Sequence, residues 1–353
     1  MRLQEAIFKV VTPLIAILLA FLVGGMIIVS IGKSPIEAYL FLFKGAFGSE
    51  SALATTLVKA TPLIFTGLAA TFAYRCGVFN LGAEGQFIMG SIGSIVVATT
   101  LPKAVALPAP IIFMISMIAG IVFGGLWGAI PGLLKVWRGL NELIVSILLN
   151  YVATLFMSYL VNGPMMEKSI PQTAAVEEQL RIPFLSNTMR LHYGFFAALL
   201  VALIIFYFLF QTSKGMQLRA VGLNQMASKV YGINVNQFVL ISFIISGAIA
   251  GLGGSIEVHG YSFRLMPGYG NGFGFDGVAI ALIGQLNPIG TVLAACFYAA
   301  LRTGANMMQV ASGIPTSVVA IIQALVIIFV IAGSALTNLP KTKSFFQKVF
   351  KEV

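Results

Sequence analysis

The sequence predicts an all-α membrane protein whose chain crosses the bilayer about ten times. Of its 353 residues, 58% are hydrophobic and only 9% are charged, which leaves too little polar surface for a soluble domain of this size. Several uncharged runs reach the roughly 20 residues that a helix needs to cross a membrane. The short alternating segments that are typical of a membrane β-barrel are absent.

The apolar runs set the expected spans. The first run is too long for the core of a signal peptide, so we expect a retained span there. Asn287-Pro288 divides another apolar stretch and leaves a first piece of about 12 residues, too short to cross alone. We therefore expect a broken or half-helix at that point. The spans are predicted near residues 10–31, 54–74, 83–101, 109–134, 140–161, 191–210, 238–258, 276–287, 289–310 and 315–335.

Lysine and arginine set the expected orientation. They gather before the first span, after the fourth, in the loop 211–237 and in the tail 338–353, and basic loops stay on the cytoplasmic side. With an even number of spans, both termini are then cytoplasmic. The segments 32–53 and 162–190 lie outside, and we expect the second to be irregular and exposed. The whole chain, 1–353, is one transmembrane domain in the cell membrane. The net charge of +10 follows from this bias and does not indicate a nucleic-acid partner.

The loop 211–237 is polar and carries three basic residues and no acid. Asn224 can cap a short helix, and Gly232 can end it. A short capped helix on the cytoplasmic face suggests docking to a soluble partner. A solvated connector between two spans is the alternative.

The segment Gly77–Gln86 holds a polar cluster beside a predicted span, formed by Asn80, Glu84 and Gln86. A carboxylate at membrane depth is costly and usually faces protein or water. Its glycines permit a broken helix whose polar groups line a cavity. The alternative is an ordinary loop in which Glu84 is favoured by the dipole of the following helix.

Two similar stretches hint at an inverted repeat. Residues 82–85 (GAEG) open one span, and residues 274–277 (GFDG) open another. The predicted topology puts these two openings on opposite sides of the membrane, as in the inverted repeats of many transporters. Asn150 lies deep in the fifth span and needs a partner there. Contact with a neighbouring helix and contact with substrate are both open for it.

Glycines recur every four residues through the fourth span, at Gly120, Gly124, Gly128 and Gly132. Small residues on one stripe let helix backbones approach closely in lipid, so we expect a packing role. The stretch 261–277 is rich in glycine and aromatic residues. Its rings suit stacking on a flat base or an aromatic belt at the membrane interface.

The sequence shows no catalytic or metal-binding arrangement. Gly32-Lys33-Ser34 resembles the end of a phosphate loop, but Ile27 replaces the required first glycine, so we expect no ATP site in this chain. Cys76 and Cys296 lie far apart in or near apolar segments and suit apolar filling. We expect a transport protein rather than an enzyme, with no metal.

Four stretches together resemble permeases of the branched-chain amino acid/ribose ABC importer family, and most closely its nucleoside (guanosine-type) branch. They are GVFNLGAEGQ (77–86), GLNELIVSILLNYVA (139–153), AVGLNQMASKVYGI (220–233) and FDGVAIALIGQLNPIG (275–290). The resemblance implies import of nucleosides, with purine nucleosides expected. It also implies a second related permease, cytoplasmic ATPases that bind ATP and Mg, and an extracellular substrate-binding lipoprotein. This chain would hold no cofactor of its own.

The resemblance also implies roles for residues. The substrate path is expected to involve Phe79, Asn80, Glu84, Gln86, Asn150, Phe275 and Asp276. Coupling to the ATPase is expected to involve Gly222, Asn224, Ala227, Gly232 and Ile233. Two alternatives stay open: an ABC permease for a simple sugar, and an ion-coupled secondary transporter with Glu84, Asp276 or Glu257 as the coupling carboxylate.

Overall fold

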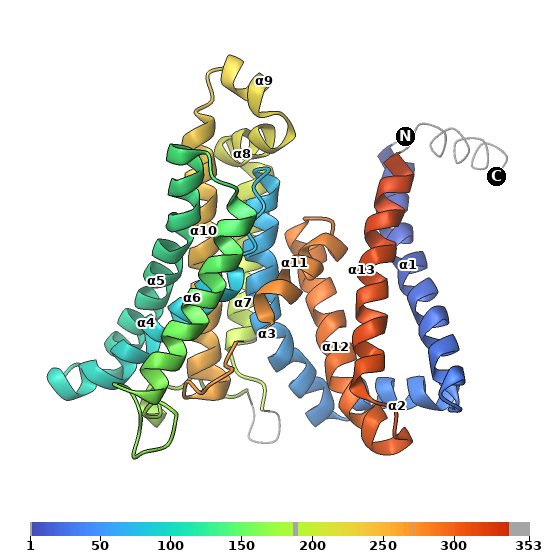
Figure 1. Cartoon of the computed structure of the whole chain (residues 1–353), viewed down its shortest axis with the longest axis horizontal. Helices are drawn as coiled ribbons and strands as arrows, with labels where there is room; N and C mark the ends of the chain where they lie inside the picture. The colour runs from blue at the N-terminus through green and yellow to red at the C-terminus, as the bar shows by residue number, and fades with distance from the viewer. Residues whose placement is uncertain (1, 186–189, 271, 339–353) are drawn as a thin grey trace. The chain divides into compact units, whose positions relative to one another are not determined.

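The computed structural model describes residues 2–185, 190–270 and 272–338, and these fold into helices and connecting loops (Figure 1). Within those ranges no strand forms, and only two isolated β-bridges occur, both between residues 167 and 192. The predicted all-α class is confirmed. The α-helices are α1 (Arg2–Ser30), α2 (Pro35–Phe47), α3 (Glu50–Arg75), α4 (Ala83–Ala104), α5 (Ala109–Arg138), α6 (Glu142–Asn162), α7 (Gly194–Gln211), α8 (Ser213–Leu223), α9 (Gln225–Val230), α10 (Val235–Glu257), α11 (Phe273–Ile283), α12 (Pro288–Ser312) and α13 (Thr316–Asn338), with a 3₁₀ turn at Glu178–Leu180 and a π-helical turn at Val258–Ser262.

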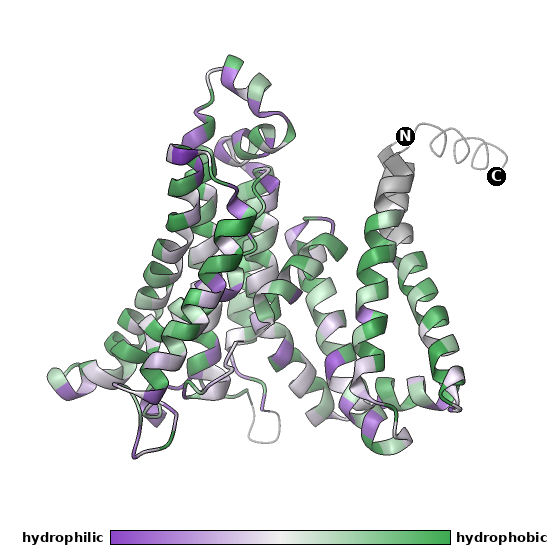
Figure 2. Cartoon of the chain, in the orientation of Figure 1, coloured by the Kyte–Doolittle hydropathy of each residue, from purple (hydrophilic) through white to green (hydrophobic). Residues whose placement is uncertain are grey.

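Each of the ten predicted spans corresponds to a helix, but not all of these helices are long and apolar enough to cross a membrane. Eight of those described are long and apolar enough: α1, α3, α4, α5, α6, α7, α10 and α13. Figure 2 shows hydrophobic residues along most of their length. The predicted half-helix is α11, with 11 residues. α12 has 25 residues but is interrupted by polar side chains, among them Arg302 and Asn306.

The chain divides into two compact units. The first comprises residues 1–53 and 300–353, in which α1 packs against α13 and α2 crosses α12 at Gly304. The crossing depends on Gly45 and Gly304, because a Cβ on Gly304 would overlap the carbonyl oxygen of Leu42. The predicted tail lies almost wholly outside the described residues, since the description ends at 338.

The second unit, residues 54–299, is built around α5 and α10. Their backbones touch where glycines face each other: a Cβ on Gly124 would overlap the carbonyl oxygen of Gly247, and a Cβ on Gly251 would overlap that of Gly120. Small residues at a helix crossing allow this approach and the dispersion contacts that come with it. Gly128 and Gly132 continue the same contact toward Phe243.

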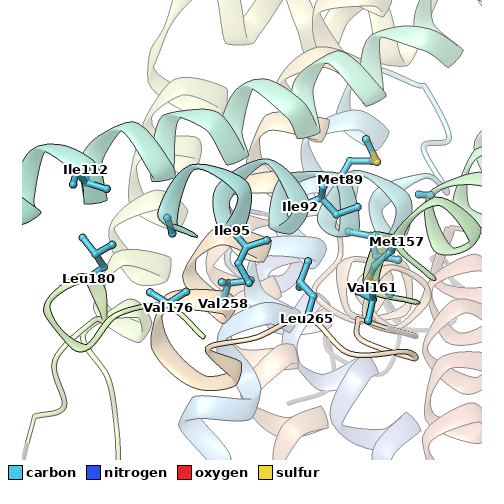
Figure 3. Close-up of a cluster of buried hydrophobic side chains, with 13 residues drawn as sticks. Met89, Ile92, Ile95, Ile112, Met157, Val161, Val176, Leu180, Val258 and Leu265 are labelled. Carbon is cyan, nitrogen blue, oxygen red and sulfur yellow. The ribbon is translucent and has the colours of Figure 1, made fainter. Parts of the chain in front are cut away.

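The segment between α6 and α7 is irregular and largely exposed, as predicted, but a few of its side chains are buried. Val176 and Leu180 are fully buried beside Ile95 and Val258, in a cluster that also includes α5 and α6 (Figure 3). The backbone nitrogens of this segment donate to residues 263 and 265, from Val176 at 2.9 Å and Thr173 at 3.0 Å. This part of the segment can be buried because its peptide groups find these partners.

The α5–α10 contact predicts a difference between two adjacent glycines. Gly124→Ala should lower the free energy of unfolding by about 1–3 kcal/mol, because the added methyl forces the helices apart. In Gly125→Ala the new methyl lies 3.4 Å from its nearest neighbour, so stability should be unchanged or slightly higher. Thermal unfolding of the purified protein in detergent measures both. Equal melting temperatures for the two variants would contradict the packing assignment.

Candidate functional site

The connector between α3 and α4, residues 76–82, turns back into the bundle beside α3. The Asn80 amide donates to Ser246 Oγ at 2.8 Å, and Ser246 Oγ donates to the carbonyl of Ala69 at 2.8 Å. Ala69 lies six residues before the end of α3, which is about 9 Å along the helix axis. α4 therefore begins well inside the bundle rather than at its surface.

Side chains satisfy the peptide groups that this break in the helix leaves free. Asn80 Oδ1 accepts from Gly82 N at 2.8 Å, and the Asn80 amide also donates to Gln86 Oε1 at 3.0 Å. Asn150 of α6 accepts from Gly85 N and donates to the carbonyl of Leu81, both at 2.9 Å. Backbone away from water needs such partners. Three of the predicted path residues are thus buried and bonded around one connector.

The fourth, Glu84, links two helices that are far apart in the sequence. It lies in the first turn of α4, and its Oε2 accepts from Gly272 N, the N-cap residue of α11, at 3.0 Å. A Cβ on Gly274 would overlap the backbone of Glu84. The positive ends of two helix dipoles meet at this carboxylate, which is the favourable charge for them. Glu84 is only 8% exposed.

The openings of α4 and α11 were expected on opposite sides of the membrane, and the structure brings the two openings into contact inside the bundle. Both helices start inside the bundle. The connector of α4 runs back along α3, and Gly274 admits a close approach to the backbone of Glu84, while Gly272 N donates to the Glu84 carboxylate. The inverted repeat itself stays a prediction.

α11 continues along α3 from this meeting point. Gly277 packs against Thr66, and Asp276 accepts from the Tyr298 hydroxyl of α12 at 2.9 Å. Thr71 of α3 is hydrogen-bonded to Thr291 of α12 at 2.8 Å. The structure therefore places Asp276 one turn from the capped start of α11 and gives it a partner in the next helix.

Two of the predicted aromatic residues present their rings at the surface of the chain. Phe79 is 53% exposed and lies edge-on to Tyr74, and Phe275 is 46% exposed. Phe87, Tyr269 and Phe273 instead form a ring cluster, with centroids 5.5–6.0 Å apart around Phe87. Exposed rings can stack on a base, whereas the cluster supports the start of α11.

The sequence analysis missed a polar face on α12. Arg302, Asn306 and Gln309 are all exposed and follow one another at helical spacing. In a membrane such a face turns to protein or water rather than to lipid. The sequence could have indicated this face, because these three polar residues are spaced four and three apart, as on one side of a helix. Also missed was Trp127, whose buried Nε1 lies beside Gly85 without a hydrogen-bond partner in the described part of the chain.

Residues 52–331 match the family described as the branched-chain amino acid transport system permease component. The chain belongs to this family of ABC permeases. It is 39% identical to the guanosine ABC transporter permease protein NupP of Bacillus subtilis, over 92% of this chain and 93% of that protein. It is 34% identical to the glucose ABC transporter permease protein TsgB13 of Haloferax volcanii (91% and 87%) and 30% identical to a second B. subtilis guanosine permease, NupQ (70% and 79%).

Family membership identifies the permease as a multi-pass membrane protein and as the transport subunit of an ABC importer rather than an enzyme. It also excludes the ion-coupled secondary transporter. The described residues contain no group of three or more His, Cys, Asp or Glu that could hold a metal.

The predicted coupling residues lie in and around α8 and α9, at one end of the second unit (Figure 1). Asn224 Oδ1 accepts from Ala227 N at 2.9 Å and caps α9. Gly232 follows the helix with φ of 78°, and Ile233 N donates to the carbonyl of Ser228 at 3.0 Å. This is a left-handed glycine ending of a helix, so both predicted ends of the short helix are confirmed. Their role in coupling stays a prediction.

The site predicts that Glu84 contributes to stability through the α11 cap. Glu84→Ala should lower the free energy of unfolding by about 1–2 kcal/mol, because it leaves a helix N-terminus without its acceptor. Glu84→Gln keeps an acceptor oxygen but not the charge and should lose less. Thermal unfolding of the permease in detergent measures both. Glu178→Ala is the control, since its side chain is 92% exposed. A Glu84→Ala variant as stable as this control would refute the cap.

Proposed function

We propose that this permease carries purine nucleosides into the cell as part of an ATP-driven importer. The observation that supports this most is the similarity to the guanosine permease NupP along almost the whole of both chains. The polar connector and the two helix N-termini at Glu84 lie within the matched region.

The proposed path passes the connector at Asn80, Glu84, Gln86 and Asn150. The hydrogen bonds between Asn80 and Gln86, and those of Asn150 with the backbone of Gly85 and Leu81, give the segment a defined shape. The exposed rings of Phe79 and Phe275 offer faces on which any base can stack, because stacking does not depend on the hydrogen-bonding groups at the edge of the base. A conduit must release what it passes, so few direct contacts to the base are needed, and selectivity can reside in a delivery protein.

The proposed assembly contains a second, related permease, two cytoplasmic ATPases that bind ATP and Mg, and an extracellular substrate-binding lipoprotein, while this chain holds no cofactor. NupP and NupQ, both named as guanosine permeases in one organism, support a pair of different permeases. The importer sits in the cell membrane with α8 and α9 in the cytoplasm, because their loop is basic. Both termini would be cytoplasmic. The lysines of the tail beyond 338 lie outside the described residues.

The surface that docks the ATPase is proposed to be the apolar side of α8 and α9. Leu223, Met226, Val230 and Tyr231 are between 78% and 88% exposed. Large apolar side chains gathered on a polar loop mark an interaction surface. Asn224 and Gly232 fix the ends of α9 and so hold these side chains in place.

A simple sugar is the second candidate substrate, because the chain also matches a glucose permease at 34% identity. The two are separated by uptake into vesicles that contain the complete importer with ATP inside. Labelled guanosine should accumulate, unlabelled glucose should not compete, and a proton ionophore at constant ATP should have no effect. Glucose accumulation without guanosine uptake would establish the sugar instead, and uptake without ATP would contradict the proposal as a whole.

Gly232 provides a test of coupling. Gly232→Val should cut ATP-driven uptake at least about tenfold while the permease still folds, because a β-branched residue is strained at positive φ and displaces the end of α9. Gly32→Val is a matched control: its φ is 77°, and like Gly232 it has no atom within 4 Å of an added Cβ. Uptake and stimulated ATPase activity are measured together. An equal loss in both variants, or none in Gly232→Val, would contradict the coupling role.

A further inference from the structure

The half-helix α11 is held at both ends by charged side chains that flank one connector. Glu84 accepts from Gly272 at its start. At its end, Arg75 donates from Nε to the carbonyl of Leu286 at 2.7 Å and from a terminal nitrogen to that of Gln285 at 3.4 Å. Arg75 is the last residue of α3 and Glu84 the second of α4. The two side chains at the ends of the segment 75–84 therefore hold both ends of a helix that lies about 200 residues further along the chain.

The turn that Arg75 holds is strained. Gln285 and Leu286 have φ of 54° and 55°, a left-handed conformation that costs a non-glycine residue of order 1–3 kcal/mol. Such backbone persists where its surroundings fix it. The planar guanidinium supplies two directed donors to the two carbonyls, a geometry that the single ammonium of a lysine does not reproduce.

The backbone of the same segment lies directly against the backbone of α8. A Cβ on Gly222 of α8 would overlap the carbonyl oxygen of Arg75, and a Cβ on Gly77 would come within 3.0 Å of Gly222 Cα. Since no flexible side chain separates the two backbones, a displacement of α8 cannot be absorbed there. The ring of Phe210 forms a second link, with the guanidiniums of Arg75 and Arg219 at 5.4 and 5.0 Å from its centroid.

We propose that Arg75 is a positioning residue for transport, which makes α11 move with α8. When α8 shifts, the backbone contact at Gly222 moves the end of α3. The hydrogen bonds from Arg75 to residues 285–286 then move α11 as well. Because Glu84 holds the other end, the meeting point of α4 and α11 shifts as well. This inference rests on the proposed docking of the ATPase to α8 and α9.

The test compares Arg75→Lys with Arg138→Lys in the complete importer. Both substitutions keep a positive charge at a helix end. Arg138, however, is exposed and lies at the end of α5, and it takes no part in the contact between Arg75 and residues 285–286. For Arg75→Lys we expect an unchanged yield of complex and unchanged basal ATPase activity. The number of nucleoside molecules moved per ATP should fall at least about tenfold. Arg138→Lys should match the wild type.

A purely structural role is distinguished by a second variant. Leu286→Gly removes the cost of the left-handed conformation and so compensates for a lost structural support. If Arg75 only stabilises the turn, the double variant Arg75→Lys/Leu286→Gly recovers both the melting temperature and the transport that Arg75→Lys has lost. If Arg75 positions α11, melting temperature recovers and transport per ATP does not.

Normal transport per ATP in Arg75→Lys, or its recovery in the double variant, would overturn the inference while leaving the proposed function intact. Failure of the proposed function shows itself separately, because the wild-type importer would then take up no nucleoside in response to ATP.

Discussion

The structure depends on one constraint: peptide groups that a helix break exposes inside a membrane need partners from the protein. α4 and α11 both begin within the bundle, where water is scarce, and each start leaves amide groups without helical acceptors. Asn80, Asn150 and Glu84 supply those acceptors. Without them the connector would have no stable course beside α3, and the two helix N-termini would not meet.

Close packing of glycines makes room for this arrangement. The α5–α10 contact brings two backbones together, and Ser246 on α10 faces both Asn80 and the Ala69 carbonyl of α3. A larger residue at Gly247, next to Ser246, would move α10 and with it the partner of Asn80. The helix crossing and the polar connector are thus parts of one structure, although the sequence analysis treated them as separate features.

The Glu84 carboxylate at the α4–α11 junction stabilises the site. It neutralises two helix dipoles and is nearly inaccessible, so it orders the site more than it contacts a solute. Phe79 and Phe275 are far more exposed than Glu84, and under the proposed function they are the side chains available to a base. This division suits a conduit that keeps its shape while it binds weakly.

The sequence by itself determined the fold class, the positions of the helices, the half-helix before Asn287-Pro288 and the caps of α9. Each follows from apolar length or from a local turn, which depend on neighbours in the chain. Only the tertiary structure decided that α4 and α11 begin in contact, that Val176 and Leu180 are buried, and that Arg75 holds residues 285–286. These contacts join segments distant in sequence, and their geometry is set by where helices cross, which no local pattern encodes.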